Sequence, residues 1–140
     1  RWLEFRRVLF RSADYLPNYQ ITTVFTSAKN AKNERNLTKN FLRGFSQGID
    51  DYASTMIDKK NGEAGINEMV DLIHKYVYTS RPRAKAAPSI INGTMRLSAG
   101  ASLNLRSVKD QLDWFKAEGL VKKSITIDTL VDQSYVKIIS

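Results

Sequence analysis

Residues 34–60 read ERNLTKNFLRGFSQGIDDYASTMIDKK, the longest amphipathic stretch of the chain. Its apolar side chains recur at three- and four-residue steps, which is the spacing of one face of an α-helix. They are Leu37, Phe41, Leu42, Phe45, Ile49, Tyr52, Met56 and Ile57. We therefore expect one long helix from Glu34 to Lys60 whose apolar face is buried in the core. Asn33 is a candidate N-cap, and Gly62 supplies a left-handed exit after the last turn.

Two glycines, Gly44 and Gly48, lie one turn apart inside this predicted helix. Each costs about 1 kcal/mol of helix stability relative to alanine. We expect another part of the protein to approach the helix closely at these two positions.

The composition is that of a globular domain. The chain has 140 residues, 42% of them hydrophobic, and no apolar run long enough to cross a membrane as a helix. It contains no cysteine, which excludes disulfides, thiolate metal sites and cysteine nucleophiles. The net charge of +8 raises the question of a nucleic acid or an anionic membrane as partner.

The first twelve residues have an unusual origin in our interpretation. Leu3–Ser12 reads LEFRRVLFRS, which back-translates to a DNA sequence that resembles a short-read sequencing adaptor. We therefore expect residues 1–12 to be adaptor read-through and residues 13–140 to be the native part. Because four arginines lie in this segment, excluding it lowers the net charge of the remainder. The alternative is a short basic amphipathic helix at the N-terminus.

Further along the chain, residues 19–27 (YQITTVFTS) are rich in β-branched and aromatic side chains, which predicts the one main β-strand. Apolar spacing predicts a second helix at 65–78 and a third at 105–118, the latter capped by Asn104 and ended by Gly119. Between them, Pro88 is expected to stop any helix that starts after Pro82. The prediction is thus a predominantly α-helical chain with one strand.

Residue types that could carry catalysis are sparse. His74 is the only histidine, and we expect it to lie on the surface because no second metal-ligand residue stands at a suitable spacing. Asp50 and Asp51 are adjacent, so they diverge on a helix and do not form an acid–base pair. The sequence predicts no catalytic residue, no metal site, no cofactor and no enzyme activity.

Two other groups of residues are candidate binding sites. Arg81, Arg83 and Lys85 could bind an anion, but no aromatic residue is interleaved with them. Trp114 and Phe115 are typical of helix packing rather than of a ligand platform.

Several sequence blocks resemble the C-terminal part of the substrate-binding proteins of ABC transporters in the nitrate, sulfonate, taurine and thiamine-precursor group. The first blocks are YQITTVFTS at 19–27 and NLTKNFLRGFSQGIDDY at 36–52. The terminal block is formed by Leu105, Val108, Asp110, Gln111, Trp114, Phe115, Glu118, Gly119, Leu120, Val121, Asp132, Ser134, Tyr135 and Val136. The similarity extends from Ala13 to Val136, and it rests on the order and spacing of these short motifs.

This resemblance implies an α/β fold, the type 2 periplasmic-binding-protein fold, of which the chain would be a predominantly helical C-terminal fragment. It implies that residues 13–140 are part of a solute-binding domain, containing an inter-lobe strand and C-terminal helices. In such proteins a solute is gripped between two lobes that close about a hinge. The hinge candidates in the inter-lobe strand are Tyr19, Gln20, Thr22, Val24 and Thr26.

The same resemblance implies capture of a small organic or inorganic solute for an ABC permease, in the periplasm or as a cell-surface lipoprotein. It implies neither a membrane span nor a nucleic-acid partner, and most ligand contacts and the export signal would lie upstream. The fragment alone is not expected to bind solute. The alternative function is a small basic helical domain that binds nucleic acid, which requires a continuous basic face. Against it, Lys39 and Arg43 on the long helix are followed by Asp50, Asp51 and Asp58.

Overall fold

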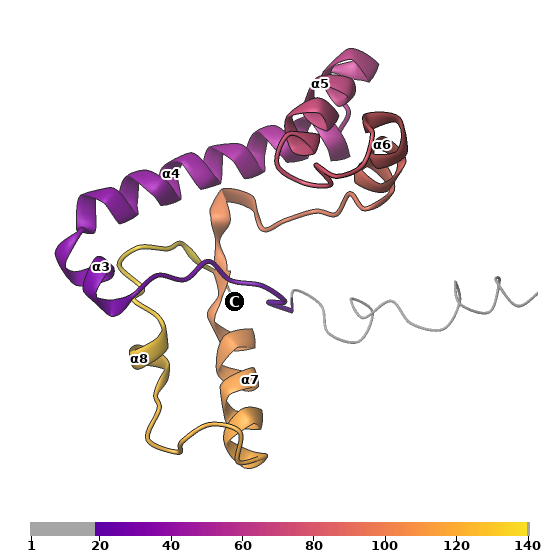
Figure 1. Cartoon of the computed structure of the whole chain (residues 1–140). Helices are drawn as coiled ribbons and strands as arrows, with labels where there is room; N and C mark the ends of the chain where they lie inside the picture. The colour runs from indigo at the N-terminus through magenta and orange to yellow at the C-terminus, as the bar shows by residue number, and fades with distance from the viewer. Residues whose placement is uncertain (1–18, 140) are drawn as a thin grey trace, which may run out of the picture. The chain divides into compact units, whose positions relative to one another are not determined.

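The computed structural model describes residues 19–139, so the proposed adaptor segment at residues 1–12 lies outside the described residues. The described chain is predominantly helical and has one small parallel sheet of two strands (Figure 1). It divides into two compact units. Of the described residues, one unit contains 19–27 together with 102–139, and the other is Ala28–Ala101.

The Ala28–Ala101 unit is entirely helical in its regular structure. Its elements are α3 (Ala28–Asn33), α4 (Arg35–Tyr52), the π-helix η1 (Ala53–Ile57), α5 (Gly62–His74), α6 (Arg83–Asn92) and the short 3-10 helix η2 (Ala99–Ala101). The long helix predicted from residue 34 is confirmed over most of its length by α4 and η1 together. The predicted N-cap is wrong, because Asn33 ends α3 and Glu34 stands at the cap position without a side-chain bond.

The π-helix η1 changes the hydrogen-bonding pattern at the end of the long helix. The backbone N–H of Asp58 donates to the carbonyl oxygen of Ala53, five residues earlier, over 2.9 Å. Within η1, Thr55 and Met56 are both buried. The chain then turns through Gly62, whose φ of 59° is the left-handed conformation expected from the sequence.

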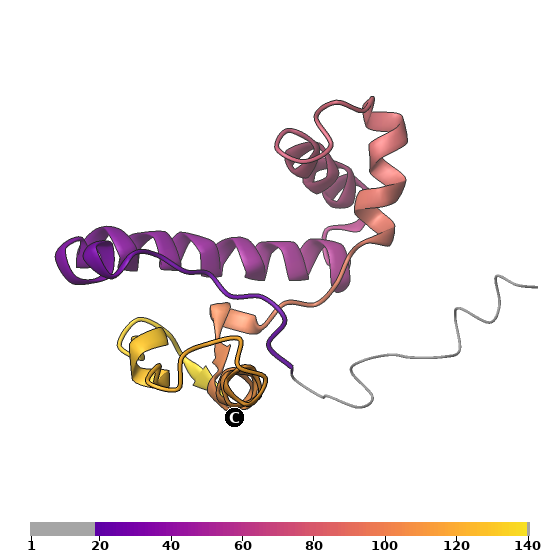
Figure 2. The same ribbon diagram turned by 60° about the horizontal axis from the view of Figure 1, so that its bottom comes forward.

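The core of this unit lies where η1, α5 and α6 meet. Its buried side chains are Met56, Val70, Ala86 and Ile90, and Val70 is fully inaccessible to solvent. Figure 2 shows α5 and α6 side by side near the C-terminal end of α4. The core is therefore built on the last turns of the long helix rather than on its whole length.

The N-terminal half of the α4 apolar face is exposed, contrary to the prediction that all eight apolar side chains are buried. Leu37 is 64% exposed and Phe41 is 58% exposed, whereas Ile49 is buried. Phe41 and Phe45 stack on each other with ring centroids 6.2 Å apart. The contacts expected at the two glycines of α4 are also missing, because a Cβ added at Gly44 or Gly48 would meet nothing within 4 Å.

Helix α6 corrects the prediction that Pro88 ends a helix. Pro88 lies inside Arg83–Asn92, where its ring removes one backbone donor from the helix. Burial of Ala86 and Ile90 in the core offsets this loss. Pro82, in turn, stands at the N-cap position.

The other unit contains β1 (Leu103–Asn104), α7 (Leu105–Ala117), α8 (Ile127–Leu130) and β2 (Ile138–Ile139). The two strands are parallel, with Leu103 opposite Ile138 (Figure 2). The prediction for α7 is confirmed at both ends. The Asn104 side chain accepts a hydrogen bond from the Ser107 N–H, and Gly119 has a φ of 70°.

The strand predicted at 19–27 is wrong: these residues form no regular structure. A strand needs a partner for its backbone groups, and the neighbouring strand β1 pairs with β2 instead. The backbone N–H and C=O of Gln20 are bonded to side chains of α7. The β-branched composition of the segment is therefore satisfied without a sheet.

Candidate functional site

The five hinge candidates differ sharply in their surroundings. Tyr19, Thr22, Val24 and Thr26 are exposed, whereas Gln20 is half-buried against the start of α7. Gln20 has hydrogen bonds to residues far away in the sequence. The site that the structure builds from these candidates is centred on Gln20.

Gln20 is joined to α7 by three hydrogen bonds of 2.9 Å. Its backbone N–H donates to the Ser107 hydroxyl, and its side-chain Oε1 accepts from the backbone N–H of Asn104. Its carbonyl oxygen accepts from Nε2 of Gln111. The Gln20 Nε2 donates to the carbonyl oxygen of Thr22 over 2.7 Å. We call Gln20, Asn104, Ser107 and Gln111 the Gln20 clamp.

The clamp is positioned by the N-terminus of α7. Asn104 caps the helix with its side chain and offers its backbone N–H to Gln20. Ser107 lies in the first turn and Gln111 one turn later, so both face the same side of the helix. Asn104 and Ser107 are buried, which makes each of these polar contacts costly to lose.

The sequence did not predict this contact. Gln111 belongs to the terminal block of the resemblance, but 91 residues separate it from Gln20. The only available signal was that both residues belong to blocks of the same resemblance. The clamp contains no titratable side chain, so what it can do is fix the 19–22 segment to α7.

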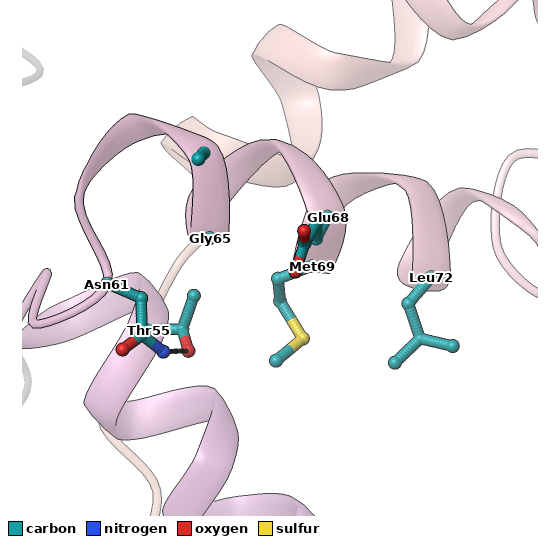
Figure 3. A pocket seen from close by; sticks show the side chains of 7 residues that line it. Thr55, Asn61, Gly65, Glu68, Met69 and Leu72 are labelled. Carbon is teal, nitrogen blue, oxygen red and sulfur yellow. Dashed lines mark hydrogen bonds between the residues drawn. The ribbon is translucent and has the colours of Figure 1, made fainter.

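A pocket of about 390 Å³ lies in the Ala28–Ala101 unit, between η1 and the side of α5 that runs from Ala64 to Leu72. It is lined by Thr55, Asn61, Ala64, Gly65, Glu68, Met69 and Leu72. Figure 3 shows the Met69 and Leu72 side chains extending from α5 to the same side, and Asn61 next to Thr55. Asn61 Nδ2 donates to the Thr55 hydroxyl over 3.1 Å.

The pocket is suited to packing more than to catalysis. Glu68 is its only titratable lining residue, so it contains no acid–base pair. The two polar groups beside it, the Asn61 amide and the Thr55 hydroxyl, are bonded to each other. Gly65 lies in the first turns of α5 at a position too crowded for a side chain: an added Cβ would lie 2.3 Å from the Cβ of Asn61.

His74 and the two adjacent aspartates have structural contacts. The Nε2 atom of His74 lies 2.8 Å from the Arg81 carbonyl oxygen, and the ring is half-buried rather than on the open surface. Asp50 accepts a hydrogen bond from the Gly100 N–H over 3.5 Å, while Asp51 is exposed. Neither arrangement joins two titratable side chains.

The basic cluster is only partly as the sequence indicated. Arg83 forms an ion pair with Asp71. The Cζ atom of Arg81 lies 5.4 Å from the centroid of the Tyr78 ring. The structure thus brings an aromatic ring to a cluster that lacks one in the linear pattern. Trp114 and Phe115 contact each other edge to face, and both are exposed.

One carboxyl group has a shifted pKa. The hydrogen bond from Arg96 lowers the pKa of Asp58 below its ordinary value of 3.8, and the positive charges of Arg96 and Lys60 act in the same direction. The Arg96 Nη2 lies 2.7 Å from the Asp58 Oδ1. This pair ties the segment after α6 to the end of η1.

Residues 19–139 contain no group of three or more His, Cys, Asp or Glu side chains arranged to hold a metal ion. In the same residues, no helix combines the length and the apolar character needed to cross a bilayer. Comparison with known proteins gave no match to a family model, to a curated protein or to a solved structure.

Proposed function

We propose that the chain is part of the solute-binding protein of an ABC importer, of the group that takes up nitrate, sulfonates, taurine or thiamine precursors. In this proposal residues 13–140 form part of a type 2 periplasmic-binding-protein fold and act outside the inner membrane. They capture a small solute together with a first lobe and present it to the permease. The chain has no catalytic role.

The observation that carries the proposal is the Gln20 clamp. The resemblance rests on separate sequence blocks, and two of these meet through the 2.9 Å hydrogen bond from Gln111 to Gln20. The end of the terminal block leads directly into β2, which pairs with β1 beside the same helix. Contacts between blocks are expected if the blocks belong to one architecture, and this contact supports the proposal.

A second observation concerns the α4 block. Its apolar face at Leu37, Phe41 and Phe45 is exposed in the described unit. A helix that lies against the sheet of a larger lobe has such a face, because the apolar stripe of an amphipathic helix is normally covered. The predominantly helical character of the described chain agrees with a C-terminal portion of an α/β protein.

The proposal is tested at the DNA level and then by binding. The genomic reading frame that contains residues 13–140 should encode a first lobe and an export signal, next to genes for a permease and an ATPase. The protein encoded by that frame should bind one of nitrate, taurine, an alkanesulfonate or a thiamine precursor in isothermal titration calorimetry. A frame that encodes no such lobe refutes the proposal.

The nucleic-acid alternative has its own readout. A protein of residues 13–140 that shifts duplex DNA in a gel, with affinity falling steeply as salt rises, would favour the alternative function. Absence of a shift at low salt, together with solute binding by the longer protein, supports the proposed one.

A further inference from the structure

The segment between α5 and α6 combines exposed aromatic and aliphatic side chains with cations. We call residues Lys75–Pro82 the basic–aromatic loop. Tyr76 is 72% exposed and Val77 is 47% exposed, and Tyr78 is also on the surface. Three apolar side chains in succession are rarely left in water without a reason in a short surface loop.

The loop has a defined conformation. The His74 side chain at the end of α5 bonds to the carbonyl oxygen of Arg81, and the Arg81 N–H donates to the carbonyl oxygen of Tyr78 over 2.9 Å. Arg83 ties the start of α6 to α5 through Asp71 and through Asn67. The loop is therefore held at its base by polar contacts.

The cations of the loop lie against its aromatic rings. The Lys75 Nζ is 5.7 Å from the Tyr76 centroid, and the Arg81 Cζ is 5.4 Å from the Tyr78 centroid. Tyr78 adopts a φ of 60°, a conformation that costs energy for a residue with a side chain and that sets the course of the loop.

The loop and the helix that follows it contain cations and no acidic residue. The sequence from Leu72 to Lys109 contains no aspartate or glutamate. Arg83 has its acidic partner in Asp71, but within the described residues Lys75, Arg81 and Lys85 form no ion pair. Cations without acidic partners beside exposed apolar groups present a surface complementary to an anionic partner that also has an apolar layer.

We infer that the basic–aromatic loop, with Lys85, docks on an anionic lipid surface. Tyrosine and valine side chains enter the boundary between headgroups and acyl chains, while lysine and arginine remain at the level of the lipid phosphates. A single-stranded nucleic acid fits less well. Its bases stack on ring faces, and each tyrosine of the loop has a cation over one face, which leaves at most one face per ring for a base.

The test is vesicle co-sedimentation of the full chain, with about one-third phosphatidylglycerol in phosphatidylcholine or with phosphatidylcholine alone. The chain should bind the anionic vesicles, with affinity falling as salt rises, and leave the neutral ones free. The K75E/R81E variant should bind at least about tenfold more weakly, because it removes two cations at the contact and adds two anions. Y76S should weaken binding about threefold or more while keeping the salt dependence.

The matched control is the K122E/K123E variant, which replaces two exposed lysines of the other unit. It lowers the net charge from +8 to +4, just as K75E/R81E does. The control should change affinity by less than about threefold, since it leaves the cations and the rings of the loop unchanged. Circular dichroism establishes that each variant keeps its helix content.

Three results would overturn the inference. The first is failure of the chain to bind anionic vesicles. The second is equal loss of binding in K75E/R81E and K122E/K123E, which would mean that only net charge matters. The third is tighter binding to a fluorescent oligothymidylate, abolished by K75E/R81E, which would make the loop a nucleic-acid surface.

Discussion

Substitution of Gln20 by alanine tests the clamp on which the proposed function rests. The change removes the Oε1 atom that accepts from the Asn104 N–H, and Asn104 is only 7% exposed. A buried donor left without a partner costs about 1–3 kcal/mol, which corresponds to roughly 5- to 150-fold in an equilibrium constant. The two backbone bonds of Gln20, to Ser107 and from Gln111, do not depend on its side chain.

The assay is amide hydrogen exchange followed by NMR. Because the backbone bonds of residue 20 remain, we expect the loss of protection to be largest at the Asn104 amide, by about 5- to 150-fold. The Ser107 amide, which donates to the Asn104 side chain, should lose less. Helix α7 should keep its protection in the turns that follow.

Thr22→Ala is the matched control. Thr22 is an exposed member of the same segment, and it contributes only its backbone carbonyl to Gln20. An alanine keeps that carbonyl, so the Asn104 amide should exchange as in the unsubstituted chain. Equal protection of the Asn104 amide in Gln20→Ala and in the unsubstituted chain would refute the clamp.

Four further substitutions probe the other unit. Val70→Ala in the core should destabilise the chain to urea by about 2–3 kcal/mol, whereas Leu72→Ala, at a site 54% exposed, should cost less than about 1 kcal/mol; equal costs would contradict the assigned core. Gly65→Ala should lower the free energy of unfolding by about 1–3 kcal/mol, because its methyl would lie 2.3 Å from a neighbouring side-chain carbon. An unchanged free energy would show that the start of α5 can relax around the methyl. Arg96→Gln should raise the pKa of Asp58 toward 3.8 in an NMR titration, and no change would exclude the ion pair.

The pH dependence of the last prediction has a definite sign. A carboxyl group whose pKa is lowered by folding stabilises the folded state above its ordinary pKa of 3.8. That contribution disappears as the pH falls through the lowered folded-state value. In Arg96→Gln the free energy of unfolding should therefore change less as the pH falls below 3.8, because Asp58 contributes less to it.

Helices with strong local signals were predictable. Apolar spacing gave the long helix, and α7 was marked by its cap at Asn104 and its glycine exit at Gly119. These features act within one or two turns, so they are visible in the order of residues. The prediction for α6 failed because the local effect of Pro88 is offset by burial of Ala86 and Ile90, which depends on tertiary contacts.

The candidate site was predictable only in outline. The hinge candidates were chosen from the resemblance, and the sequence could not separate Gln20 from its four exposed neighbours. The difference comes from Asn104, Ser107 and Gln111, which lie more than eighty residues away. The β-branched composition of the segment favours a strand. Composition carries no information about the partner that a strand requires, so the prediction failed.

The long helix of residues 34–60 is the element for which the proposed function explains most. Its last turns are covered: Ile49 and Met56 are buried, and Met56 packs in the core with Val70. Its first turns keep the same apolar periodicity but leave Leu37 and Phe41 exposed. Exposed apolar side chains repeated along several helical turns lower the solubility of a protein. In the proposed function a sheet covers these side chains and removes that cost. The proposed function accounts for both observations: the last turns of the helix pack in the core with Val70, and the first turns would pack against a larger lobe.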